Sequence, residues 1–293
     1  MIKTLVITGP TACGKTVLAV ELALRCGGEV VNADSVQVFE GFDIGAAKPI
    51  VGEMRGVPHH LLSVADPREP YTVAQYRHDA LAAMEDIHAR GKAAIVCGGT
   101  GLYIESLFTD RSHAVPPNPE LRRDIEAAGN LHARLAALDA ASAKAIHPND
   151  TKRLVRALEI VLTTGALVPR GEGAWQPMPI VALDWPVDAL RARIYARAAA
   201  MVAAGLVDEV RGLLAQGVGW EAQPMQALGY RQLRPYLEGA VGLDAAVADI
   251  ALKTAQFAKR QRTYIRGRMP QARWFDAQGK AMEQLAQEVM ICL

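Results

Sequence analysis

The chain has 293 residues and a mass of 31.5 kDa, and its 32 Lys and Arg residues nearly balance 31 Asp and Glu residues. With 51% hydrophobic and 22% charged residues, the composition is that of a folded globular protein and excludes disordered, collagen-like and coiled-coil chains. The net charge of +1 does not by itself indicate a partner, because an average can hide a charged face.

The first elements predicted along the chain are a strand, a glycine-rich turn and a helix. Residues 5–8 are an apolar, β-branched run that ends at a glycine, and residues 16–25 carry apolar side chains at helical spacing. Further strands are predicted at residues 30–31 and 93–97, and a Thr72-x-x-Gln75 capping box predicts a helix that ends at Gly91. Strands that alternate with helices predict an α/β fold with a parallel sheet and flanking helices.

The pattern changes after residue 113, where prolines and glycines separate short helical segments and no strand is predicted. Asp150 is predicted to begin a helix that ends at Gly165, a loop is expected over 169–179, and residues 180–183 form a strand. Residues 186–265 are predicted to be helical. We therefore expect residues 1–112 to form the first part of the core, 113–178 a small helical insertion, and 179–293 the second part of the core with a basic C-terminal helix.

A phosphate-binding motif follows the first predicted strand. Residues 9–16 match G-x-x-x-x-G-K-[ST] between a strand and a helix, which is the context that a P-loop requires. Backbone N–H groups and the helix N-terminus would bind phosphate, the lysine would add a positive charge, and the final hydroxyl could hold Mg²⁺. The predicted phosphate-binding residues are Gly9, Pro10, Thr11, Ala12, Cys13, Gly14, Lys15 and Thr16.

The P-loop does not identify the phosphorylated ligand. An NTPase usually has a second strand that ends in an aspartate supporting Mg²⁺, but the strand at 93–97 ends in Gly98-Gly99-Thr100, which weakens the ATPase interpretation. Asp34 follows the strand at 30–31, at the sheet edge where a P-loop ligand would be reached. From the residues alone it is a metal support, a general base or the cap of a turn.

Longer motifs make the chain similar to the tRNA dimethylallyltransferases, the bacterial tRNA isopentenyltransferase family. The similarity covers nearly the whole chain, with the motifs in the family's order, and it departs from the family pattern at Cys13 and Ala46, where the family usually has serine and threonine. The matching segments are residues 32–39, 41–49, 98–103, 147–150, 153–159, 229–232 and 258–261.

This resemblance implies transfer of a dimethylallyl group from dimethylallyl diphosphate to N6 of the adenosine immediately 3′ of the tRNA anticodon. The P-loop would then hold a diphosphate leaving group, with Mg²⁺ on Thr16 as the cofactor. The implied catalytic residues are Asp34, as the base for the adenine amino group, Thr100, which would contact adenine or diphosphate, and Arg231, which would contact phosphate oxygens.

The resemblance also implies that the adenosine leaves the anticodon stem-loop to enter a pocket beside the P-loop. Between residues 250 and 275 there are seven Lys and Arg residues and no Asp or Glu, which indicates a phosphate-facing surface; a merely solvated helix face is the alternative. The predicted tRNA-binding residues are Asp34, Ser35, Val36, Gln37, Thr100, Arg122, Lys152, Arg153, Leu154, Val155, Arg156, Lys259 and Arg260.

Three other functions remain open from the sequence. The chain could be a P-loop kinase of a small molecule or nucleotide, a nucleotide-switched RNA-binding protein without enzymatic activity, or a prenyltransferase that acts on free AMP or ADP. The longest uncharged stretch, residues 93–104, is too short to cross a bilayer, and the N-terminus lacks a signal-peptide cleavage site. We therefore expect a cytoplasmic monomer that does not contact a membrane.

Overall fold

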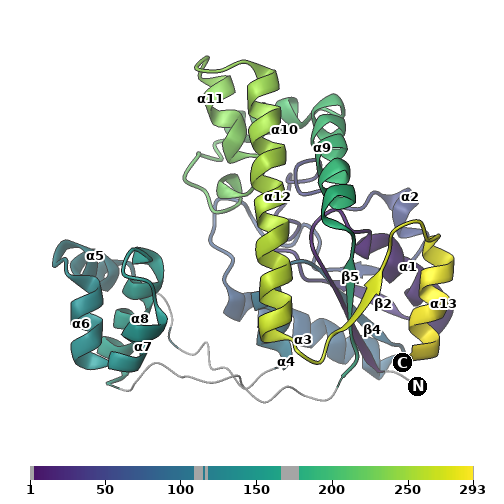
Figure 1. Cartoon of the computed structure of the whole chain (residues 1–293), viewed down its shortest axis with the longest axis horizontal. Helices are drawn as coiled ribbons and strands as arrows, with labels where there is room; N and C mark the ends of the chain where they lie inside the picture. Colours follow the sequence, from purple (N-terminus) through teal and green to yellow (C-terminus); the bar gives the residue numbers. More distant parts are fainter. Residues whose placement is uncertain (1–2, 109–114, 116–117, 166–177, 293) are drawn as a thin grey trace. The chain divides into compact units, whose positions relative to one another are not determined.

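The computed structural model describes residues 3–108, 115, 118–165 and 178–292. These residues belong to two compact units, one formed by Met1–Phe108 together with Gln176–Leu293 and the other by Thr109–Trp175. The larger unit contains the sheet, and the smaller unit is helical (Figure 1).

The larger unit is built on a six-stranded parallel sheet with the strand order β3-β2-β4-β1-β5-β6. At its centre, Val6 of β1 lies opposite Val96 of β4 on one side and Ile180 of β5 on the other. This confirms the predicted α/β fold with a parallel sheet. The strands are β1 (Thr4–Thr8), β2 (Glu29–Asn32), β3 (His59–His60), β4 (Ala94–Cys97), β5 (Ile180–Asp184) and β6 (Arg273–Asp276).

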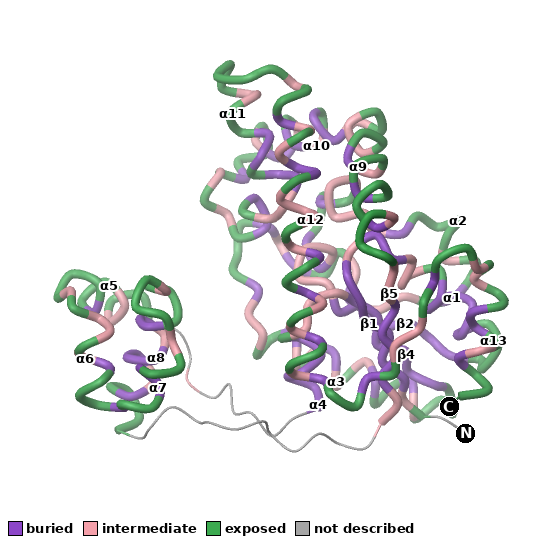
Figure 2. The backbone as a smooth tube through the Cα atoms, in the orientation of Figure 1, coloured by how far each residue is buried: buried purple, intermediate pink, exposed green. Residues whose placement is uncertain are grey.

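The four inner strands are buried on both faces, as Figure 2 shows for β1, β2, β4 and β5. Leu5 and Ile7 pack with apolar residues of α1 and α13, whereas Val6, which alternates with them, is buried on the opposite face. Helices therefore cover both faces. The α-helices of this unit are α1 (Lys15–Cys26), α2 (Val51–Met54), α3 (Val73–Ala89), α4 (Gly101–Phe108), α9 (Val187–Ala203), α10 (Leu206–Ala215), α11 (Arg234–Leu237), α12 (Leu243–Arg268) and α13 (Met282–Cys292).

The sequence predictions identify the inner strands and miss both edge strands. Runs predicted at residues 5–8, 30–31, 93–97 and 180–183 correspond to β1, β2, β4 and β5, and the Thr72–Gln75 capping box begins α3 as predicted. The edge strands β3 and β6 are half-exposed or exposed, so they lack the continuous apolar run that marks a buried parallel strand. His59 and His60, where no strand is predicted, form β3.

The described residues of the smaller unit form four helices, α5 (Pro119–Ala127), α6 (Leu131–Leu138), α7 (Ala140–Ala145) and α8 (Thr151–Thr164). Asp150 caps α8 by accepting a hydrogen bond from the Arg153 backbone, and left-handed Gly165 ends it, as the sequence predicts. Most of the loop expected over 169–179 lies outside the described residues.

The core of the smaller unit is a cluster of aliphatic side chains from all four helices: Ile125, Leu135, Ala143, Leu154, Val155, Ala157 and Leu158. Across both units, none of the helices that the structure describes combines the length and apolar character needed to span a membrane.

Candidate functional site

The P-loop between β1 and α1 contains residues with positive φ, a backbone conformation that glycine adopts easily and other residues rarely adopt. Gly9 has φ 141°, and a Cβ atom there would lie 2.6 Å from the Leu183 carbonyl oxygen, so a side chain would collide with β5. Ala12 and Gly14 are also left-handed, with φ 64° and 95°. Among the described residues no side chain caps the start of α1, so its first N–H groups are available to an anion.

The P-loop lysine folds back onto its own loop. Lys15 Nζ donates to the Pro10 carbonyl oxygen at 2.8 Å and lies 3.9 Å from Cys13 Sγ. Burial raises the pKa of the Cys13 thiol, although nearby Lys15 opposes this effect, so this cysteine is an uncharged packing residue. A ligand phosphate would replace these internal partners of the ammonium group.

Two side chains donate hydrogen bonds to carbonyl oxygens of the P-loop. Arg193 Nε donates to the Ala12 oxygen at 2.9 Å, and Trp185 Nε1 donates to the Cys13 oxygen at 3.1 Å. The Arg193 guanidinium lies 4.3 Å from the centroid of the Trp185 ring, so the two side chains also stack on each other. This support keeps the left-handed turn at Ala12 in place.

A glutamine from α12 joins the P-loop to the loop after β4. Gln261 Oε1 accepts from the Thr11 backbone at 2.8 Å, and its Nε2 donates to the Gly99 oxygen at 2.9 Å. A Cβ atom on Gly99 would lie 2.4 Å from that amide, so a side chain there would displace the Gln261 amide from this position. The buried Gln261 side chain therefore fixes the distance between two loops that are remote in sequence.

Asp34 is predicted as a base, a metal support or a cap. In the structure, one of its carboxylate oxygens caps the turn that follows β2. Its Oδ1 accepts from the backbone N–H groups of Val36 at 2.9 Å and Gln37 at 3.3 Å. Within the described part of the chain Oδ2 has no hydrogen-bond partner, and Asp34 lies on the walls of two cavities. The cap therefore orients the carboxylate and leaves its second oxygen available.

Thr100, predicted to contact the substrate, holds the turn that contains Asp34. Its Oγ1 accepts from the Ser35 backbone at 3.0 Å and lies 3.2 Å from Ser35 Oγ. The Thr100 backbone donates to the Ala33 oxygen at 3.1 Å. Because a Cβ on Gly98 would lie 2.1 Å from that same oxygen, the loops after β2 and β4 can meet only with glycine there.

Two adjoining cavities in the larger unit bring these residues together. The P-loop pocket, about 690 Å³, contains Gly14, Lys15 and Thr16, and the helix pocket, about 350 Å³, contains all three predicted catalytic residues together with apolar side chains of α9 and α12. The residues that line both pockets are Thr11, Ala12, Asp34, Ala46 and Arg197.

Arg197 is a candidate functional residue that the sequence analysis missed. It is half-buried in α9, lines both pockets, and has no hydrogen bond or ion pair with any other described residue. Burial lowers the pKa of its guanidinium, and the nearby Asp34 carboxylate opposes that effect. A desolvated cation without a partner, next to a P-loop, is suited to an anionic ligand. The only hint in the sequence is that Arg193 and Arg197 are one helical turn apart.

The predicted tRNA-binding residues of the larger unit lie around these pockets. Ser35, Val36, Thr100 and Arg260 line the helix pocket, and Gln37 lines the P-loop pocket. Lys259 is exposed on α12. All of them are therefore close to the candidate site or on the helix that borders it.

The basic stretch at 250–275 needs correction, because it is not free of counter-charges in the folded chain. Arg262 and Arg266 both pair with Asp184 at the end of β5, and Arg273 donates to the Cys292 carbonyl oxygen. The acid that neutralises two of the seven cations is about 80 residues away in sequence, so a local count cannot find it.

In the smaller unit, several of the predicted RNA-binding residues have structural roles. Leu154 and Val155 are 1% and 4% exposed and belong to the core of the unit, so their side chains offer no surface to RNA. Arg122 and Arg156 both bind the buried carboxylate of Glu159. The exposed cations among the predicted residues of this unit are Lys152 and Arg153.

The residues around the P-loop are compatible with Mg²⁺ bound through a phosphate. The described residues contain no group of three or more His, Cys, Asp or Glu side chains able to hold a metal ion. Mg²⁺ that bridges substrate phosphates needs only one or two protein ligands and keeps its waters. Thr16 and Asp34 both line the P-loop pocket and provide oxygen ligands of that kind.

Comparisons of sequence and of structure match this chain to the same kind of protein. Residues 37–268 match the family model for IPP transferase. The chain is 45% identical to the tRNA dimethylallyltransferase of Thermomicrobium roseum, over 97% of this chain and 89% of that protein. It matches the solved tRNA isopentenylpyrophosphate transferase of Bacillus halodurans at 35% identity and TM-score 0.76, over 100% and 95% of the two chains. A eukaryotic dimethylallyltransferase solved acting on tRNA matches at 28% identity and TM-score 0.83, over 95% and 75%.

Proposed function

The chain belongs to the IPP transferase family and is a prenyltransferase that acts on tRNA, and from this premise we propose how its two pockets divide the work. The P-loop pocket binds dimethylallyl diphosphate through its diphosphate group. The helix pocket receives the adenosine immediately 3′ of the anticodon, and the dimethylallyl group passes to N6 of its base.

The donor side of the proposal rests on the positive groups around the P-loop. The free N–H groups at the start of α1, Lys15 and Arg197 bind the diphosphate oxygens. Thr16 would hold Mg²⁺ when the ion is bound, and the ion would supply further positive charge near the leaving group. These groups stabilise the negative charge that develops as the carbon–oxygen bond breaks.

The acceptor side rests on Asp34 and its neighbours. As N6 forms its bond to the allylic carbon, the carbon–oxygen bond to diphosphate breaks and one N6 proton passes to Asp34 Oδ2. The cap contacts to Val36 and Gln37 and the Thr100 hydroxyl keep the carboxylate turned toward that proton. Arg231, exposed at the rim of the helix pocket, contacts the phosphate oxygens of the donor or the RNA.

The observation that carries this proposal is the position of Asp34 on the wall shared by the two pockets. A base that takes a proton from the acceptor while the donor loses its leaving group has to reach both substrates. Arg197 shares the same wall, so a proton acceptor and a diphosphate-binding cation lie where the two cavities meet.

Product analysis tests the proposed function. The protein is incubated with labelled dimethylallyl diphosphate and unfractionated tRNA, with ATP, AMP and ADP as parallel candidates, and the free nucleotides and the digested tRNA nucleosides are analysed by mass. We expect prenylated adenosine from tRNA and no consumption of ATP. A phosphorylated product would support a kinase, nucleotide-dependent RNA binding without product would support a switch protein, and prenylated AMP or ADP would support a free-nucleotide acceptor.

A further inference from the structure

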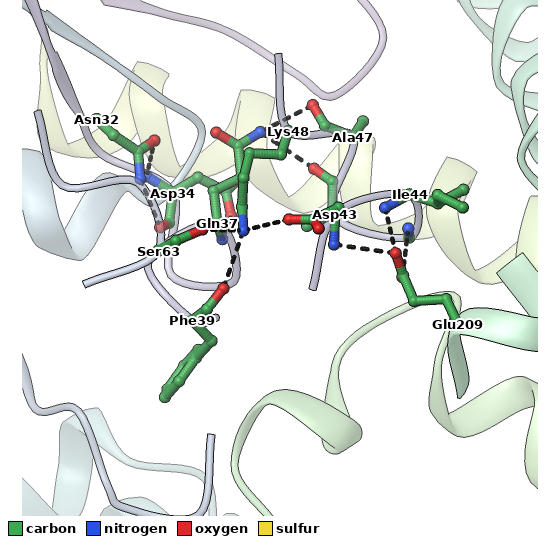
Figure 3. Close-up of polar contacts among 12 residues, drawn as sticks. Asn32, Asp34, Gln37, Phe39, Asp43, Ile44, Ala47, Lys48, Ser63 and Glu209 are labelled. Atoms are coloured by element: carbon green, nitrogen blue, oxygen red, sulfur yellow. Dashed lines mark hydrogen bonds and ion pairs between the residues drawn. The ribbon is translucent and has the colours of Figure 1, made fainter. Parts of the chain in front are cut away.

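A carboxylate outside both pockets binds a run of backbone amides beside them. Glu209, in α10, accepts from the N–H groups of Asp43 at 3.1 Å and Ile44 at 2.6 Å through Oε2, and from Gly45 at 3.1 Å through Oε1 (Figure 3). Three consecutive amides that converge on one anion form the kind of nest that loops use to bind ligands. Here the anion belongs to the protein itself.

A tyrosine extends this contact by one residue. Tyr230 OH donates to Glu209 Oε1 at 2.8 Å and accepts from the Ala46 backbone at 3.0 Å. The Tyr230 ring is buried, and a Cβ atom on Gly45 would lie 2.5 Å from it. Two side chains that are more than 160 residues away in sequence therefore bind the N–H groups of residues 43–46. Residues 43–47 are called here the wall loop.

The wall loop lines both pockets, and two of its carbonyl groups accept hydrogen bonds from the Gln37 side chain. Residues 45–46 line the helix pocket, and residues 43, 44, 46 and 47 line the P-loop pocket. Gln37 Nε2 donates to the carbonyl oxygens of Ala46 and Ala47, each at 3.1 Å, and the Gln37 backbone donates to Asp34 Oδ1. A continuous path of hydrogen bonds thus joins Glu209 to the proposed base.

A second anchor holds the opposite side of the loop. Lys48 Nζ binds the Phe39 carbonyl oxygen at 3.0 Å, Asp43 Oδ1 at 2.6 Å and Ser63 Oγ at 2.6 Å (Figure 3). Among the described residues, the hydrogen-bond partners of the Glu209 carboxylate lie in the wall loop and at Tyr230, and none lies in its own helix. Its role is therefore in the loop and the site that the loop borders.

We propose that Glu209 is a positioning residue: it fixes the wall loop, and through Gln37 it fixes Asp34 in the orientation that receives the tRNA adenosine. The inference rests on the proposed function for its assignment of Asp34 and Gln37 to the acceptor side. Residues of the wall loop also line the P-loop pocket. The groups proposed to bind diphosphate, however, lie on the P-loop and α9, and among the described residues neither element provides a hydrogen-bond partner of the Glu209 carboxylate, so we expect the acceptor side to respond more strongly than the donor side to its loss.

The test compares Glu209→Gln with Asp208→Asn. Glutamine keeps the shape of the side chain but places an amide NH₂ against backbone donors, whereas Asp208 is exposed and pairs only with Arg211 among the described residues. For Glu209→Gln we expect the KM for tRNA to rise about tenfold and kcat to fall about tenfold, roughly one lost hydrogen bond each. The dissociation constant for inorganic diphosphate should stay within about twofold, and Asp208→Asn should match the wild type.

Hydrogen exchange measured on a peptide covering residues 41–48 reports on the loop directly. Faster exchange in Glu209→Gln, with the P-loop peptide unchanged, supports the proposal. Unchanged exchange, or a loss of diphosphate binding in parallel with tRNA binding, overturns it. If Glu209→Gln does not fold, Tyr230→Phe removes a single hydroxyl from the same contact, and an unchanged KM for tRNA in that variant also overturns the proposal. Failure of the wild type to prenylate tRNA is a different result, which counts against the proposed function itself.

Discussion

The two oxygens of Asp34 have different tasks in this structure. Oδ1 caps the turn at Val36 and Gln37, while Oδ2 has no hydrogen-bond partner among the described residues, and the Asp34 residue lines both cavities. The capping and base interpretations of the sequence are therefore compatible, because one carboxylate serves both. The two roles can be separated by choosing the substitution.

We predict that Asp34→Asn lowers kcat for prenyl transfer by about 10² to 10⁴ and leaves tRNA binding nearly unchanged. The amide oxygen of asparagine can still accept from Val36, so the turn is retained while the proton acceptor is lost. Single-turnover transfer and tRNA binding are measured side by side. Asp34→Ala, which loses both functions, should also weaken tRNA binding; full activity in Asp34→Asn would mean that Asp34 is only a cap.

The burial of Arg197 illustrates how a residue suited to ligand binding can lower the stability of the unliganded fold. A half-buried guanidinium with no described hydrogen-bond or ion-pair partner is desolvated, and the nearby Asp34 carboxylate offsets this only in part until an anion binds. The unliganded fold therefore carries the cost of a charge that its ligand satisfies.

Replacing Arg197 with methionine should weaken dimethylallyl diphosphate binding by roughly ten- to a hundredfold, since a charge-assisted hydrogen bond contributes about 1.5–3 kcal/mol. The melting temperature of the unliganded protein should stay the same or rise. Calorimetric titration and thermal unfolding check the two effects. Arg191→Met, at an exposed position of the same helix outside both pockets, is the matched control; equal affinities for the two variants would remove Arg197 from the diphosphate site.

At the level of elements, Glu159 joins the start of α5 to α8 within the smaller unit. Its side chain is fully buried and binds Arg122, Arg156 and the Asn118 backbone. Burial by itself would raise the pKa of Glu159, but these hydrogen bonds outweigh it and lower the pKa from 4.5 to about 2. The ionised carboxylate thus stabilises the fold above its unfolded pKa, and the stabilisation is lost as the pH falls from about 4.5 toward 2.

We predict that Glu159→Gln destabilises the smaller unit by about 2–3 kcal/mol at pH 7, because it leaves two arginines without their anion. Amide hydrogen exchange in α5 and α8 measures this effect. The difference between wild type and variant should shrink as the pH falls below about 4.5. Glu126→Gln on the exposed side of α5 controls for the loss of a carboxylate. A difference that persists at pH 2 would show that the charge is not the cause.

The elements and residues that the sequence predicts are those with a local signal. β1, the P-loop and the cap of α3 each depend on a few neighbouring residues, and all were found. β6 was missed because it lies at the sheet edge and pairs with a strand about 90 residues earlier. Arg197 and Glu209 were missed for the same reason: which face of a helix meets a distant loop depends on tertiary packing.

Charge is organised at the scale of the whole molecule, although the total is only +1. In α12, Arg262 and Arg266 are already paired with Asp184, while Lys259 and Arg260 are exposed and have no described acidic partner. Arg260 also borders the helix pocket and lies 5.6 Å from the Phe257 ring centroid. The cations available to RNA on α12 are therefore fewer than the sequence indicates.

The combined variant Lys259→Ala/Arg260→Ala should reduce the slope of log tRNA affinity against log salt by about two, because each cation that binds a phosphate accounts for about one unit of slope. Filter binding over a range of salt concentrations measures the slope. Lys280→Ala removes a charge that already pairs with Glu288, so its slope should equal that of the wild type. Equal slopes for all three proteins would make this part of α12 a solvated face.

The length of helix α12 has a consequence for how diphosphate departure and tRNA release are related. Its 26 residues form a rod roughly 39 Å long (Figure 1). The rod carries Arg260 at the helix pocket and, on the next residue, Gln261, which is bonded to both the P-loop and the Gly99 loop. A stiff rod leaves these groups little independent motion, so we expect a shift of the P-loop when diphosphate leaves to reach the α12 surface that is proposed to bind RNA. Loss of the leaving group would then favour release of the modified tRNA.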